Sequence, residues 1–90
     1  MAELLDDYNG MIEEEDELYM GIQVCEECTD HLLDLISEKA EAIHLPTAKA
    51  ILSAVQVIMK DLQTELLHLR IEKSMLTWEI SRLREIQNKA

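Results

Sequence analysis

Aromatic residues, glycine and proline are scarce in this chain, which has three aromatic residues, two Gly, one Pro and no Phe among its 90 residues. The aromatic side chains that favour β-strands are therefore nearly missing. The abundant residues are Leu, Glu, Ile and Ala, which mostly favour helix, as do the less frequent Met and Lys. The composition predicts an all-α chain, and we expect so short a chain to complete its core by oligomerising.

Basic residues are also few, and the net charge is −11. Residues 1–42 hold fourteen acidic residues against Lys39, whereas residues 43–90 hold five acidic and seven basic residues. The basic surface that nucleic acids require is absent, so we expect no direct contact with nucleic acid. The densest acidic stretches predict an acidic surface formed by Asp6, Asp7, Glu13, Glu14, Glu15, Asp16 and Glu17.

Signals for export and membrane insertion are missing as well. The first residues are acidic and do not show the basic and then apolar order of a signal peptide. No apolar run reaches the roughly 18 residues that a membrane span needs. The two cysteines are then expected to be reduced thiols. A cytoplasmic location and no membrane partner are the expectation.

Motifs for catalysis are not found either. There is no glycine-rich phosphate loop, and no nucleophile–histidine spacing that predicts a catalytic triad. We therefore expect no enzyme activity and no cofactor. The one set that resembles metal ligands is Cys25, Cys28 and His31, a weak candidate because structural zinc needs four ligands. Filling of the core by the two small thiols is the competing interpretation.

The strongest break in the sequence is His-Leu-Pro-Thr at 44–47, because proline disfavours helix at the residue before it. We expect a helix over 11–43, a turn over 44–47 with Thr47 as N-cap, and a long helix over 48–88. Residues 1–10 should form an acidic extension, either a short helix or a disordered tail. The short turn predicts an antiparallel helical hairpin over 11–90, with residue i opposite roughly 91 minus i.

A seven-residue apolar repeat in the second helix predicts a coiled coil. Lys73 lies in this seam, where a lysine limits oligomer number, and the flanking charges (Glu65 with Arg70, Glu79 with Arg84) favour a parallel partner. Packing of the seam on the first helix of the same chain is the alternative. The residues expected to mediate self-association are Leu52, Val55, Met59, Leu62, Leu66, Leu69, Lys73, Leu76, Ile80 and Leu83.

The first helix has a matching buried stripe, and the second helix has a further apolar stripe roughly 150° from the seam. Trp78 in this further stripe suggests a binding hot spot, with packing on the first helix as the alternative. The further stripe consists of Leu67, Ile71, Met75 and Trp78. The stripe of the first helix consists of Leu18, Ile22, Cys25, Leu32, Ile36 and Ile43, and we expect Val24, Leu33 and Leu35 to widen it.

Residues 48–59 are apolar on nearly all sides, which predicts that two hairpins form a four-helix core near the turn. The function expected is a dimeric interaction module, acting as an adaptor, chaperone or regulator of another protein. An acidic inhibitor that imitates nucleic acid is the alternative, and a cysteine-based metal or redox sensor is the weaker one. A leucine-zipper transcription factor is excluded, because the stretch directly before the leucines has only Lys49 and Lys60 where a basic region should be.

Overall fold

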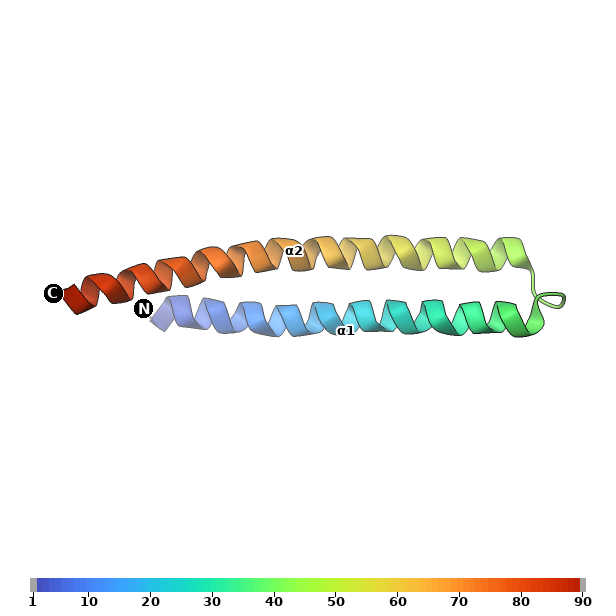
Figure 1. Cartoon of the computed structure of the whole chain (residues 1–90), viewed down its shortest axis with the longest axis horizontal. Helices are drawn as coiled ribbons and strands as arrows, with labels where there is room; N and C mark the ends of the chain where they lie inside the picture. The colour runs from blue at the N-terminus through green and yellow to red at the C-terminus, as the bar shows by residue number, and fades with distance from the viewer. Residues whose placement is uncertain (1, 90) are drawn as a thin grey trace.

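Two long helices lie side by side and antiparallel in the computed structural model, which describes residues 2–89 (Figure 1). Helix α1 spans Ala2–Lys39 and helix α2 spans Leu45–Lys89. The hairpin measures 74 × 16 × 14 Å, so it is a rod one helix pair wide. The predicted all-α hairpin with a longer second helix is confirmed. Within the described residues, neither helix is apolar enough over a sufficient length to cross a membrane.

Helix α1 begins at Ala2, nine residues before the expected start at Met11. The Asn9-Gly10 pair, which resembles a turn, stays within the helix. Leu4 and Tyr8 are half-buried and continue the three-four spacing of the stripe that follows. Packing against α2 therefore outweighs the low helix propensity of Asn and Gly.

The turn differs from the expectation in its position and in its capping residue. Helix α1 ends at Lys39, four residues before the expected end at Ile43, and α2 begins at Leu45, three residues before the expected start at Ala48. The amides of Ala42 and Ile43 donate to the Lys39 carbonyl, at 2.9 and 3.0 Å, and close the end of α1. The first bond of α2 runs from the Ala48 amide to the His44 carbonyl, so His44 is the N-cap and the prediction of Thr47 is wrong. Proline is tolerated in a first helical turn because the amides there have no helical partner, and α2 therefore begins before Pro46. The Thr47 hydroxyl instead hydrogen-bonds His44 Nδ1 at 2.6 Å.

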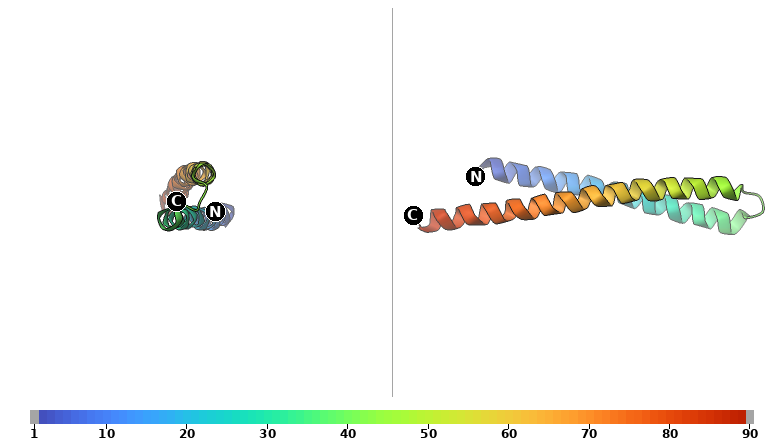
Figure 2. Two further views of the ribbon diagram at one scale, coloured as in Figure 1. Left: turned by 90° about the vertical axis from the view of Figure 1, so that its right-hand side faces the viewer. Right: turned by 90° about the horizontal axis from the view of Figure 1, so that it is seen from above.

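The two helices meet along one seam, in which buried and half-buried positions alternate in steps of three and four residues on both helices. This spacing is that of a two-stranded coiled coil, and Figure 2 shows the two helices crossing at a small angle. The α1 side of the seam is Leu4, Tyr8, Met11, Glu15, Leu18, Ile22, Cys25, Thr29, Leu32 and Ile36. The α2 side is Ala48, Leu52, Val55, Met59, Leu62, Leu66, Leu69, Lys73, Leu76, Ile80 and Leu83.

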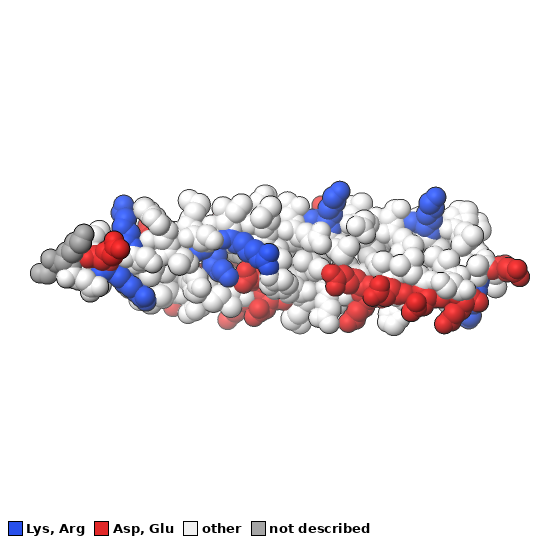
Figure 3. Space-filling model, viewed as in Figure 1, with Lys and Arg blue, Asp and Glu red and all other residues white. Residues whose placement is uncertain are grey.

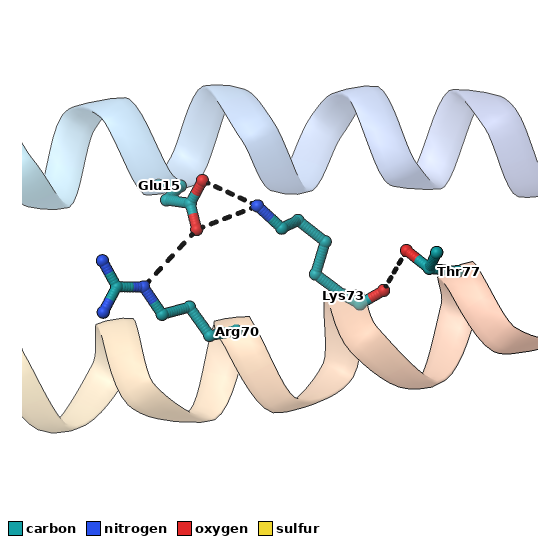
Figure 4. A network of polar contacts seen from close by, with 4 residues as sticks. All are labelled: Glu15, Arg70, Lys73 and Thr77. Atoms are coloured by element: carbon teal, nitrogen blue, oxygen red, sulfur yellow. Dashed lines mark hydrogen bonds and ion pairs between the residues drawn. The ribbon is translucent and has the colours of Figure 1, made fainter.

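One charged pair interrupts this apolar seam. Lys73 Nζ donates to both carboxylate oxygens of Glu15, at 2.9 and 3.1 Å, and Arg70 Nε lies 3.8 Å from the same carboxylate (Figure 4). The Thr77 hydroxyl, one turn further along α2, donates to the Lys73 carbonyl at 2.9 Å. Glu15 was expected opposite residue 76, so the helices are shifted by about three positions from the predicted register, close to one helical turn.

Candidate functional site

The seam residues expected to join two copies are covered by α1 of the same chain. Leu66, Leu69, Leu76 and Ile80 are buried, and the other six residues of that set are half-buried. The helix that covers them is antiparallel, whereas the charged flanks favoured a parallel partner. A second copy reaches this seam only if α1 is displaced. The surfaces that remain free for partners therefore lie elsewhere on the hairpin.

The further stripe of α2 is exposed along its whole length. Leu67 is 55% exposed, Ile71 51%, Met75 67% and Trp78 64%. At 100° per residue these four side chains fall within a narrow arc on the side of α2 turned away from α1. Trp78 is largely exposed, and the Arg82 guanidinium lies 5.4 Å from the centre of its ring. We call these four residues the outer α2 stripe.

A shallow groove of about 570 Å³ begins at the end of this stripe. Met75 and Trp78 line it from α2, and Met11 lines it from α1. Glu72 and Glu79 lie at the same groove and give it an acidic edge. Methionine side chains adapt their shape to a partner, so two methionines beside a tryptophan are typical of a binding surface.

The predicted acidic surface divides into two parts. Six of its seven residues are exposed, whereas Glu15 lies in the seam against Lys73. Across α1, thirteen acidic residues accompany the single base Lys39, a net charge of −12, while α2 carries five acidic and seven basic residues. On the side shown in Figure 3, acidic side chains gather over α1 and most Lys and Arg side chains lie over α2.

The three weak metal candidates do not converge. Cys25 is buried in the seam, and Cys28 and His31 are exposed. The Thr29 hydroxyl donates to the Cys25 carbonyl at 2.9 Å and contributes no ligand. Among residues 2–89, no group of three or more His, Cys, Asp or Glu side chains is placed to hold a metal ion.

One surface was only partly predicted from the sequence, because residues 48–59 of α2 were expected to be apolar on nearly all sides but the α1 residues beside them were expected to be buried. Val24 and Leu35 were expected to widen the buried stripe of α1, but they are 58% and 38% exposed. Leu33 is likewise 48% exposed. A second set of three-four spacings beside the seam was the signal that could have revealed this surface. We call it the turn-half stripe, and it consists of Val24, Cys28, His31 and Leu35 on α1 and Ile51, Ala54 and Ile58 on α2.

No protein-family model, no curated protein and no solved structure matches the chain. The function is therefore inferred from these surfaces.

Proposed function

We propose that this chain is a non-enzymatic protein-interaction module, an adaptor, chaperone or regulator that binds another protein through the outer α2 stripe. The observation that carries the proposal is the exposure of Trp78, at 64%, on the same side of α2 as the exposed Ile71 and Met75. Tryptophan is among the residues most enriched in binding hot spots. Its exposure together with other large apolar side chains typically marks an interaction site.

The shape of the stripe indicates the kind of partner. From Leu67 to Trp78 it extends over twelve residues, about 16 Å at the rise of an α-helix. A straight apolar strip of this length matches three turns of an amphipathic helix in the partner. The side chains of Leu67, Ile71 and Met75 then contact successive turns of that helix, and Trp78 supplies the largest buried area.

A direct test compares Trp78→Ser with Gln63→Ser, because both residues are exposed on α2 and only Trp78 belongs to the stripe. Tagged hairpins are used to capture proteins from cells of the native host, and the captured proteins are then titrated. Loss of a hot-spot tryptophan should weaken binding by roughly thirtyfold or more, corresponding to at least about 2 kcal/mol. Gln63→Ser should bind as the unchanged chain does. Equal binding by both variants would remove the outer α2 stripe as the partner site.

A second candidate function is supported by the charge of α1. Its net charge of −12, with Asp6, Asp7, Glu13 and Glu14 exposed, fits an inhibitor that imitates nucleic acid and occupies a basic protein. Ionic strength separates the two functions. Binding through the outer α2 stripe should change little between low and high salt, whereas charge imitation should weaken steeply. Both functions are proposed for the cytoplasm.

A further inference from the structure

The half of the hairpin next to the turn has one polar side. Glu26 and Asp30 of α1 line a hollow with Met59 of α2, and Glu26 lines a second hollow with Gln63 and Arg70. These shared hollows show which edges of the two helices lie together on this side. The positions of α2 nearest the turn on the same side include the exposed Lys49 and Gln56. This side therefore carries charged and polar side chains, beside the exposed Leu33.

The other side of the same half carries the turn-half stripe. At 100° per residue, Val24 and Cys28 lie about 160° around α1 from Glu26, so they belong to the opposite edge. The close approach of Gly21 to Leu62, where an added Cβ would be 3.1 Å from Leu62 Cδ1, places the matching edge of α2 beside it. The stripe therefore spans both helices.

The turn-half stripe holds no Asp, Glu, Lys or Arg, although these four residue types make up 30% of the chain. Ile51 is 49% exposed and Ile58 54%, and Val24 and Leu35 are also partly exposed. The nearest charged residues are Glu17, Glu27 and Glu38 on α1 and Asp61 on α2, of which Glu27 lies beside the middle of the stripe and the others lie at its ends. This is an unusually neutral apolar surface for a chain with a net charge of −11.

We propose that a second copy of this chain docks on the turn-half stripe, so that two hairpins form a four-helix segment beside the turn. Two-fold docking places each surface against its own copy, so any charge near the axis would meet a like charge. With thirteen acidic residues on α1, a neutral surface is where two copies can approach without strong repulsion. The acidic residues of the polar side then face outward from both hairpins.

The available area is sufficient for such a dimer. A stable interface buries roughly 800 Å² from each partner. The chain exposes 7005 Å², and one side of half the rod is about a quarter of that surface. The docked surface leaves the outer α2 stripe free, because that stripe lies in the half of α2 away from the turn. The inference therefore stands apart from the proposed partner site.

The test compares Ile58→Glu with Gln56→Glu. The two residues lie in one turn of α2, both are exposed, and both variants add one negative charge. Light scattering at several protein concentrations should give twice the chain mass for the unchanged protein and for Gln56→Glu. Ile58→Glu should give the mass of one chain, with its helical circular dichroism retained. Val24→Glu, on the other helix of the stripe, should also give the mass of one chain, and it replaces Ile58→Glu in the test if that variant does not fold.

The accessibility of Cys28 provides a second readout. Its thiol is exposed in the single hairpin, so its alkylation should slow as the protein concentration rises and the dimer covers it. In Ile58→Glu the rate should not depend on concentration. The inference is overturned if the unchanged protein has the mass of one chain at all concentrations. It is also overturned if Ile58→Glu and Val24→Glu both keep twice the chain mass. A dimer broken by Trp78→Ser but not by Ile58→Glu would assign self-association to the outer α2 stripe instead.

Discussion

The Glu15–Lys73 pair in the seam allows a quantitative test of what holds the two helices in register. We consider Glu15→Gln, Lys73→Met and the double variant, since these changes remove charge with little change in volume. The two hydrogen bonds from Lys73 Nζ measure 2.9 and 3.1 Å. The Glu15 side chain is 13% exposed and that of Lys73 is 25% exposed, so the pair is largely shielded from water.

The expected coupling free energy lies between two known limits. Exposed ion pairs contribute about 0.2–1 kcal/mol, and hydrogen bonds to charged groups contribute about 1.5–3 kcal/mol. The partial exposure of Lys73 and the presence of Arg70 at 3.8 Å reduce the upper limit, because Arg70 keeps part of the attraction when Lys73 is lost. We therefore expect a coupling of about 1–2 kcal/mol from the double-mutant cycle.

The assay is urea unfolding of the four proteins, followed by far-ultraviolet circular dichroism at one protein concentration, so that dimerisation affects all four equally. For a domain of this size, a loss of 1 kcal/mol corresponds to about 4–8 °C in Tm. The coupling should decrease in high salt, because the pair is not fully buried. A coupling below about 0.3 kcal/mol would show that the pair adds nothing beyond its separate side chains, and the role in register would have to be abandoned.

Three further outcomes are expected from single substitutions. Leu69→Asp should lower the free energy of unfolding by about 3–5 kcal/mol in urea titration, because it places a charge at a seam position that is 7% exposed; dissociation into folded hairpins would contradict the intrachain seam. Gly10→Ala should raise the free energy of unfolding by about 0.5–1 kcal/mol, since nothing lies within 4 Å of the added methyl group. Gly21→Ala should raise it less, because the added methyl group would lie 3.1 Å from Leu62 Cδ1. An equal rise in Tm for the two variants would contradict this. Trp78→Ser should change the free energy of unfolding by less than about 0.5 kcal/mol, and a larger loss would mean that the indole supports the fold.

The helical hairpin could be predicted because local and long-range signals agree. In the structure, the seven-residue repeat forms the side of α2 that packs on α1, and the single proline, Pro46, lies at the start of α2. Helix bounds could not be predicted as well, since they depend on tertiary contacts. At the start of α1, Leu4 and Tyr8 extend the seam past Asn9-Gly10. At the start of α2, proline is accepted within the first helical turn as well as in the residues that precede a helix. The N-cap at His44 follows from that same tolerance.

The partner of the leucine seam could not be determined from periodicity alone. A repeat identifies which side of a helix is buried, but it is the same whether the covering helix belongs to another chain or to α1. The ion pair shows the difficulty. Lys73 has the position of a residue that limits oligomers, and its carboxylate partner comes from the same chain, 58 residues away. Geometry predicted only that one of the two apolar stripes of α2 stays uncovered, because one covering helix cannot shield two sides of α2. Which stripe is exposed depended on the placement of α1.

The width of the rod links the two proposed surfaces. A pair of helices 16 × 14 Å across can bury one stripe on each helix and no more, so apolar residues outside the seam remain in water unless another molecule covers them. Two groups of such residues are the outer α2 stripe and the turn-half stripe, and others, such as Met20 and Val57, lie outside both. The outer α2 stripe involves one helix, is edged by Glu72 and Glu79, and suits a single helix from a partner. The turn-half stripe involves both helices and is neutral, which suits a second hairpin with the same surface. Because the two lie in different halves of the rod, substitutions in one should leave binding at the other unchanged, and each proposal can fail without the other.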